Sequence, residues 1–404
     1  MLRGGLRRII KLSLIFFICW ISFVPDPFQA QYKLQLNLGL GMLFLLSLIE
    51  QRFNFREYFL NPSAAVLGAY FLLLLPGALS SNQAFVFYKD FCLSAASVFF
   101  IFRQVAKSKD YQEILYCLVV CAGIVSLLGI LEMFFKANPV YLYLLDNPYY
   151  LRFIGKRVMS TLVHPNIVGA YLIGCAPLAN YFYRNAPTYR LKLFNLACFC
   201  LIVAGIILSF SRGTWFAGLL ICSFWLWQVG KKKWISYLWL GCLFFSILSA
   251  FSIFGPGFSK RFGIVRLFYY VRFSHRAKNY LITWDVLKNH PLVGIGLNHY
   301  REFAANFTRY RLNPEVRVPD SIYLMHLAET GLLGFLGLML LLGVVFKKAW
   351  KNRQSALFLG FLGLLINMAA FDGLLWQTTF YLFWIFLAIL SVTAGAGEMS
   401  VKNK

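Results

Sequence analysis

The stretch SIYLMHLAETGLLGFLGLMLLLGVVF, from Ser321 to Phe346, decides the fold of this chain. It is longer than the roughly 20 apolar residues that cross a bilayer core, and Glu329 is the only Asp, Glu, Lys or Arg in it. Similar apolar runs recur along a chain that is 60% hydrophobic and 13% charged, whereas a soluble domain carries about 25% charged residues. The sequence therefore predicts an all-α integral membrane protein, with residues 1–404 as a single membrane domain.

The apolar runs predict about twelve membrane-spanning helices. The fourth is the weakest, because Lys89 and Asp90 lie inside it. Lys and Arg are frequent in the even-numbered connections and in both tails, and rare in the short odd-numbered connections. Since positive charge favours the cytoplasmic side, both termini are predicted to be cytoplasmic in a multi-pass protein of the cytoplasmic (inner) membrane. The predicted spans are 9–25, 34–49, 63–79, 85–102, 111–135, 161–183, 191–210, 214–229, 234–254, 321–346, 355–371 and 375–394.

One long break, residues 255–320, interrupts the spans and holds eleven Lys or Arg against four Asp or Glu. By this topology the break is an extracytoplasmic loop, on the side where basic residues are normally avoided. Positive charge kept there favours an anionic ligand at the outer face. Segments 265–273, 279–287 and 300–307 are apolar enough to form short helices near the membrane. Gly294 and Gly296 are expected to form a tight turn between the last two.

Composition excludes some partners and cofactors. The net charge of +24 reflects topology and attraction to membrane lipid with anionic headgroups, and no basic cytoplasmic domain is present to bind nucleic acid. All nine cysteines lie in apolar runs, so neither a disulfide framework nor a thiolate metal site is expected. Neither a metal nor a cofactor is predicted.

Basic residues near the outer face are the candidates for binding phosphate groups. Arg212 follows the seventh span, and a guanidinium group can contact two phosphate oxygens at once. Arg309, Arg311 and Arg317 lie in the long loop close to Asp320. The alternatives are an interface anchor for Arg212 and contacts with lipid headgroups for the other three.

Two residues are candidates for moving a proton. His164 opens the sixth span and is a candidate general base or sugar-hydroxyl ligand, the alternative being a helix cap with Pro165 at the first turn. Asp320 precedes the tenth span as a candidate acid or base, and Asp320 or Ser321 is equally expected to cap that helix. Glu329 lies inside the span, so it needs a partner or a neutral state. His326 is expected to be structural, and Lys89 and Asp90 to form an internal pair.

Four segments carry a resemblance to a known family. They are His164-Pro-Asn166; Leu208-Ser-Phe-Ser211-Arg212-Gly213-Thr-Trp215; Trp284 through His290-Pro-Leu-Val-Gly294-Ile-Gly296-Leu-Asn298-His-Tyr300; and Asp320-Ser-Ile-Tyr323-Leu with Glu329-Thr-Gly331-Leu-Leu-Gly334. In this order, with one long outer loop between them, they resemble the O-antigen ligase family, which includes O-antigen polymerases. The resemblance covers roughly residues 150–340.

The resemblance implies a GT-C-like protein of about twelve spans. It also implies metal-independent transfer of a polyprenyl-diphosphate-linked glycan to an acceptor, either a glycan or a lipid-anchored sugar, at the outer face. An arginine at the position of Arg212 would contact the diphosphate. Two positions differ from the family. Asp320-Ser321 stands where the family usually has His-Asn, and Tyr280 stands where it often has Arg, with Arg276 and Lys278 nearby.

The predicted mechanism is displacement at an anomeric carbon, with cations stabilising the leaving diphosphate and a base removing the proton of the acceptor hydroxyl. Ligase and polymerase differ only in the acceptor. A transporter or flippase for an anionic lipid-linked glycan is the rival function, but it should place charges through the membrane midplane. The charges here lie mostly at outer ends, which favours an enzyme. The outer basic excess argues against a non-catalytic scaffold.

Overall fold

The computed structural model describes residues 2–50, 61–108, 110–136, 157–231, 233–239, 241, 275–307, 318–350 and 355–392. Every regular element in these ranges is helical, which confirms the all-α class for the described part of the chain. Each predicted span corresponds to a helix except 234–254, most of which lies outside the described residues. The long helices are α1 Leu2–Phe23, α3 Lys33–Glu50, α5 Pro62–Ala78, α6 Asn82–Val105, α7 Asp110–Phe135, α9 Pro165–Arg184, α10 Tyr189–Leu208, α11 Arg212–Gln228, α17 Ile322–Ala349, α18 Ala356–Met368 and α19 Gln377–Leu390.

Within the described residues, four helices are long and apolar enough to cross a membrane: α6, α7, α10 and α17. Helices α5, α18 and α19 and most of α3 are also apolar but shorter. Several apolar helices of this kind define a multi-pass membrane protein.

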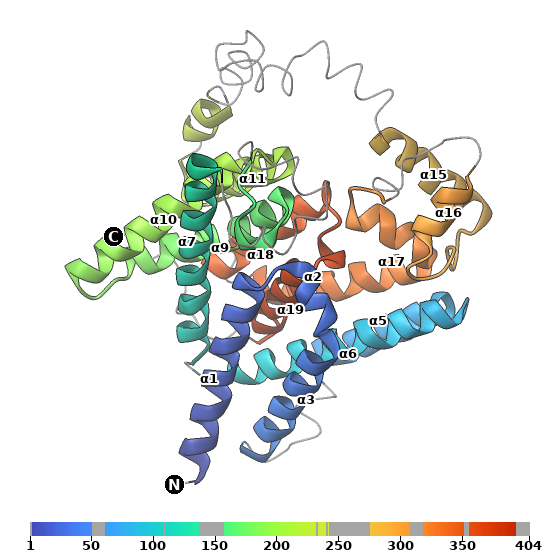
Figure 1. Ribbon diagram of the computed structural model, residues 1–404, viewed down its shortest axis with the longest axis horizontal. Coiled ribbons are helices and arrows are strands. Elements are labelled where there is room, and N and C mark those ends of the chain that lie inside the picture. Colours follow the sequence, from blue (N-terminus) through green and yellow to red (C-terminus); the bar gives the residue numbers. More distant parts are fainter. Residues whose placement is uncertain are drawn as a thin grey trace.

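Helix α19 occupies the centre of the bundle and is buried along its whole length. It packs against α6, α9 and α18 (Figure 1). Its core is aromatic: the rings of Phe383 and Trp384 meet edge to face at 5.2 Å, and Tyr381 is fully buried. A helix that is apolar on all sides is stable only when other elements surround it, which explains this position.

Short helices lie at the end of the bundle that is predicted to face outward. They are α2 Asp26–Gln31, η2 Ser160–Leu162, α15 His275–Asn289, α16 Tyr300–Asn306 and η5 Gly373–Leu375. Helices α15 and α16 pack beside α17 (Figure 1). They confirm the helices expected near 279–287 and 300–307, while the expected helix at 265–273 lies outside the described residues.

The segment between α15 and α16 docks onto a break in α17. Gly331 leaves the helical conformation there, with φ 62° and ψ −163°. The freed carbonyl groups of Ala328 and Glu329 accept hydrogen bonds from the amides of Ile295 and Gly296, both at 3.0 Å. A side chain at position 331 would lie 2.4 Å from the backbone of Leu292, so only glycine fits. The predicted tight turn is confirmed, because Gly294 and Gly296 both have positive φ.

Glu329 has the partner that its position requires. Its Oε1 accepts a hydrogen bond from the amide of Tyr300 at 3.2 Å, which fixes the start of α16 against α17. His326, one turn earlier, is buried against Tyr70, with 3.2 Å between its Nε2 and the phenolic oxygen. Both contacts hold helices together, as expected for His326.

Candidate functional site

His164 immediately precedes α9 and lies against two aromatic rings. Its ring stacks on Trp376, with centroids 5.5 Å apart, and lies parallel to Phe371 at 6.5 Å. Its Nδ1 accepts the amide proton of Asn166 at 3.2 Å, which confirms the cap predicted for this residue. In the neutral ring the proton is then on Nε2, where it can donate a hydrogen bond.

Arg157 joins two of the sequence segments. Its Nε donates to the carbonyl of Ser209 at 2.7 Å, and its Nη2 donates to Asn166 Oδ1 at 3.0 Å and to the carbonyl of Phe210 at 3.2 Å. The side chain thus ties the start of α9 to the turn before α11. The sequence analysis did not single out Arg157, because nothing in its sequence neighbourhood shows which carbonyl groups it reaches.

Arg212 is the first residue of α11, and its side chain is exposed. The next residue, Gly213, lies so close to α18 that a side-chain carbon there would be 3.1 Å from Cβ of Ala370. The start of α11 therefore abuts the turn that follows α18. Free amides at a helix start carry a partial positive charge, which adds to the guanidinium charge in attracting an anion.

Asp320 and Ser321 were the two residues predicted to cap α17. The structure places Ser321 at the cap position, and its side chain makes no cap hydrogen bond. The Asp320 carboxylate instead accepts a hydrogen bond from Arg276 Nε of α15 at 2.7 Å. Such charge-assisted contacts are stronger than neutral ones, so the carboxylate turns toward the guanidinium group. Of the two predicted cap residues, Ser321 therefore takes the cap position.

Asp372, in the turn between α18 and α19, was missed by sequence reasoning. Its Oδ1 accepts a hydrogen bond from Trp376 Nε1 at 3.2 Å, and Trp376 is the residue that stacks on His164. Burial, and then the negative charge of Asp320, raise the pKa of Asp372 to about 6. The only feature of the sequence that could have indicated Asp372 is that it is a carboxylate in a three-residue connection between two predicted spans. The short connections were compared only for their Lys and Arg content, so this acid was overlooked.

His164 and Asp372 both contact Trp376 at the predicted outer end. The charge of Asp320 acts on both of them, so we group these three residues as one cluster. Arg301 of α16 also acts electrostatically on Asp372, and on Glu329. The structure thus brings together the two candidates for proton transfer predicted from sequence, and it adds a third.

A buried carboxylate fixes the start of α19 beneath this cluster. Oδ1 of Asp26 accepts the amide proton of Gln377 at 2.5 Å. Burial raises the pKa of Asp26 to about 6. Because Gln377 follows Trp376, this contact positions the ring that touches His164.

Other predicted residues lie elsewhere. Arg309, Arg311 and Arg317 lie outside the described residues. Lys89 is exposed, and Asp90 interacts electrostatically with Lys33 of α3. The expected pairing of Lys89 with Asp90 is wrong, because adjacent residues on a helix point in different directions.

Three cysteine sulfurs meet between α1 and α7, in contrast to the expectation from sequence. Sγ of Cys19 lies 3.9 Å from that of Cys121, which lies 4.0 Å from that of Cys117. Among the described residues, this trio is the one group of His, Cys, Asp and Glu side chains whose ligand atoms lie close enough to hold a metal ion. Thiolates favour soft ions such as Cu(I) or Zn²⁺. Helix packing, rather than a sequence motif, brings them together.

The fold and the cluster define a class: a multi-pass helical membrane protein with carboxylates, an imidazole and guanidinium groups gathered at one end of its bundle. Residues 196–339 match the family described as O-antigen ligase (Wzy_C), so this segment is an O-antigen ligase family domain. No curated protein matches the chain. The matched segment contains Arg212, Arg276 and Asp320, while His164 and Asp372 lie on either side of it. The family is one of membrane glycosyltransferases of the ligase and polymerase type, whose substrates are lipid-linked glycans.

Proposed function

We propose that this protein transfers a glycan from a polyprenyl diphosphate to the hydroxyl group of an acceptor sugar at the outer face of the cytoplasmic membrane. The observation that carries the proposal is the cluster of His164, Asp320 and Asp372, which lies beside an O-antigen ligase domain that supplies Arg212 and Arg276. The acceptor of a ligase is a lipid-anchored core sugar. The alternative within the family is a polymerase, whose acceptor is another glycan on a lipid diphosphate.

Arg212 is the proposed diphosphate ligand. It combines an exposed guanidinium group with the start of a helix, and both attract phosphate oxygens. The diphosphate leaves with the electron pair of its bond to the anomeric carbon, so positive charge placed there lowers the barrier. Arg309, Arg311 and Arg317 are proposed to add to this field. The reaction then needs neither a metal nor a cofactor.

Asp372 is the proposed base. Asp320 is paired with Arg276 at 2.7 Å, so its carboxylate is already engaged by a guanidinium group. Asp372 has a pKa of about 6, so it is ionised at pH 7 yet more basic than an ordinary carboxylate. Two acids in different environments commonly take different roles. Asp320 remains the alternative base, with Asp372 then orienting Trp376.

The proposed reaction is a single displacement at the anomeric carbon, in which each bond formed is matched by one broken. The acceptor oxygen bonds to the anomeric carbon as the bond from that carbon to the diphosphate oxygen breaks. The acceptor proton passes to Asp372. His164 donates from Nε2 to a sugar hydroxyl and is held in position by Trp376.

The test is transfer by the purified protein in vesicles, with an undecaprenyl-diphosphate-linked glycan as donor. A lipid-anchored core oligosaccharide or a second lipid-linked glycan serves as acceptor, and products are measured by mass spectrometry with and without EDTA. We expect Asp372→Asn to lower transfer by about 10²–10⁴-fold, the usual contribution of a general base. Asp285→Asn on α15 is the matched control and should transfer normally.

Three outcomes would change the proposal. A greater loss in Asp320→Asn than in Asp372→Asn would exchange their roles. Inhibition by EDTA would show that the reaction needs a metal ion. Movement of the donor across the vesicle membrane without transfer to either acceptor would mean a transporter.

A further inference from the structure

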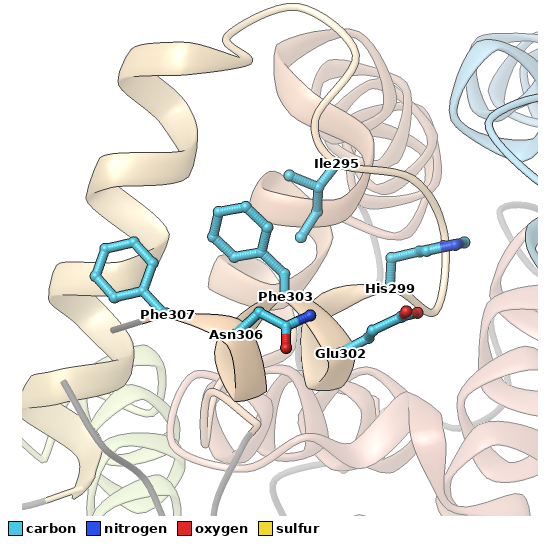
Figure 2. Close-up of a pocket in the computed structure, with 6 residues that line it drawn as sticks. All are labelled: Ile295, His299, Glu302, Phe303, Asn306 and Phe307. Atoms are coloured by element: carbon cyan, nitrogen blue, oxygen red, sulfur yellow. The ribbon is translucent and has the colours of Figure 1, made fainter. Parts of the chain in front are cut away.

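A cavity of about 350 Å³ opens beside α16, and the described residues that line it include none of those assigned to the reaction. Figure 2 shows Phe303 and Ile295 in its middle, with His299 and Glu302 on one side and Phe307 on the other. Its volume is near the lower end of the range for small-molecule pockets, about 300–1,000 Å³. The lining residues are Ile295, His299, Glu302, Phe303, Asn306 and Phe307.

The lining combines aromatic faces with exposed polar groups. The rings of Phe303 and Phe307 lie 5.9 Å apart and are partly buried. Glu302 and Asn306, one turn apart, are exposed along the rim (Figure 2). His299 is fixed between Ser81 Oγ, 3.0 Å from its Nε2, and the carbonyl of Leu297, 2.8 Å from its Nδ1. One wall of the pocket is therefore rigid.

This combination matches the chemistry of a sugar. A pyranose ring has an apolar face of C–H groups, which packs on an aromatic ring, and an edge of hydroxyl groups. A carboxylate accepts hydroxyl protons, and an amide both donates and accepts. Among the described residues that line the pocket, none is Lys or Arg, so Glu302 would repel a uronic acid while accepting a neutral or amino sugar.

Helix α16 links this pocket to the reaction centre. Arg301 acts on Asp372, and the start of the helix is held by Glu329. The neighbouring residues Glu302 and Phe303 line the pocket. The proposed diphosphate ligand lies on α11, which packs against α9 and α18, whereas α16 packs against α17. Sugar bound at α16 would therefore reach Asp372 from a different side than the donor diphosphate.

We propose that the pocket beside α16 is a binding subsite for an uncharged or amino sugar of the acceptor glycan. That the bound sugar belongs to the acceptor rests on the proposed function. That the pocket binds a sugar rests on the pocket alone. Phe303 supports the ring face, Glu302 and Asn306 bind its hydroxyl groups, and Glu302 excludes acidic sugars.

Sugar binding is measured directly with the full-length protein in lipid nanodiscs by saturation-transfer NMR. The probes are N,N′-diacetylchitobiose, lactose and digalacturonate. We expect signal from at least one of the two neutral probes and little from digalacturonate. Phe303→Ala should weaken neutral binding about two- to tenfold, the range for losing an aromatic contact. Glu302→Gln should weaken neutral binding and increase the digalacturonate signal, because the repulsion is gone.

Two substitutions on α15 are matched controls outside the pocket: Asp285→Asn for the acid and Trp284→Leu for the aromatic ring, which is 58% exposed. Both should bind like the parent protein. Glu302 is exposed, so its replacement leaves the fold intact. Equal binding by the parent and both pocket variants would overturn the subsite, as would equal loss in the controls.

The transfer assay separates this inference from the proposed function. Pocket variants should raise the KM for the acceptor with little change in kcat, the sign of lost ground-state binding. Pocket-dependent sugar binding without any transfer would remove the proposed function and leave a sugar site. Normal acceptor KM in both variants of a protein that transfers glycan would remove the subsite and leave the function.

Discussion

The two ends of the helix bundle hold their charges in different ways. At the end predicted to face the cytoplasm, Arg7 pairs with Asp110 at 2.6 Å and Lys11 with Glu113 at 2.8 Å, both between α1 and α7. Each acid meets one base, and each pair has an exposed member. Exposed pairs contribute about 0–1 kcal/mol, so they align two helices and do little else.

At the other end, an acid that is paired with a base also acts on a second acid. Asp320 pairs with Arg276 at 2.7 Å. Burial, and then the negative charge of Asp320, raise the pKa of Asp372 to about 6. Burial of an acid near a second acid costs stability, and proteins retain such arrangements mainly at functional sites. The ion pairs at the cytoplasmic end align helices, whereas the neighbouring acids at the outer end are retained although they lower stability.

The largest expected effect concerns which end faces outward. Asn306→Cys on α16 should react with a membrane-impermeant maleimide on spheroplasts, and Lys107→Cys should react only after permeabilisation. Because the chain has its own cysteines, the unsubstituted protein is the baseline. The reverse labelling pattern would show that the opposite end of the bundle faces outward. The excess of positive charge in residues 255–320 would then no longer indicate an anionic ligand at the outer face.

Arg212→Lys is expected to reduce transfer by roughly 10- to 150-fold, since losing one charge-assisted contact costs about 1.5–3 kcal/mol and an ammonium group cannot contact two oxygens in one plane. Arg190→Lys is the matched control: Arg190 also lies in the first turn of a helix, α10, but at the opposite end of the bundle. Near-normal transfer by Arg212→Lys would make Arg212 an interface anchor.

The pH dependence should follow Asp372. With a pKa of about 6, it is ionised at pH 7 and mostly protonated at pH 5, so transfer should fall about tenfold over that range if the charged form is the base. Its pKa is raised above the ordinary 3.8, so the folded protein binds this proton more tightly than the unfolded chain does. The contribution of Asp372 to stability therefore decreases as pH rises from about 4 to 6.

Protonation of Asp372 does not destabilise the fold, so a loss of activity at pH 5 would not be caused by unfolding linked to this residue. Initial rates between pH 5 and 8, with thermal unfolding measured in parallel, test the point. A flat profile in the parent protein, or the same inflection in Asp372→Asn, would exclude Asp372 as the titrating base.

The helices were predictable because lipid leaves a chain few choices. A spanning segment must satisfy its own backbone hydrogen bonds, so a long apolar run such as 321–346 indicates a helix whatever its neighbours are. The tight turn was also predictable from the local sequence, because Gly294 and Gly296 have the positive φ that the sequence indicated. The break in α17 at Gly331 was not predicted, because it depends on the segment before α16 supplying hydrogen bonds.

The site was only half predictable, because its residues meet across the fold. His164 and Asp320 stand out beside motifs, whereas Asp372 is separated from both in sequence and gains its raised pKa only from packing. Arg276 shows the same limit. The sequence marked Tyr280 as the altered family position, but one helical turn earlier Arg276 reaches Asp320. The charge expected near this position is present, displaced along α15.

The smallest expected effect tests the inner end. Arg7→Gln removes one partner of an ion pair in which the Arg7 side chain is 50% exposed, so the free energy of unfolding should fall by no more than about 1 kcal/mol. Transfer at saturating substrate should stay within about twofold of the parent, because the pair lies at the opposite end from Asp372. Thermal unfolding of the purified protein, with and without 0.5 M salt, measures the first quantity, and salt should shrink the difference because it screens exposed charges. A loss of transfer as large as that of Arg212→Lys, in protein that unfolds normally, would show that the α1–α7 pairs act on the reaction and that the two ends are coupled.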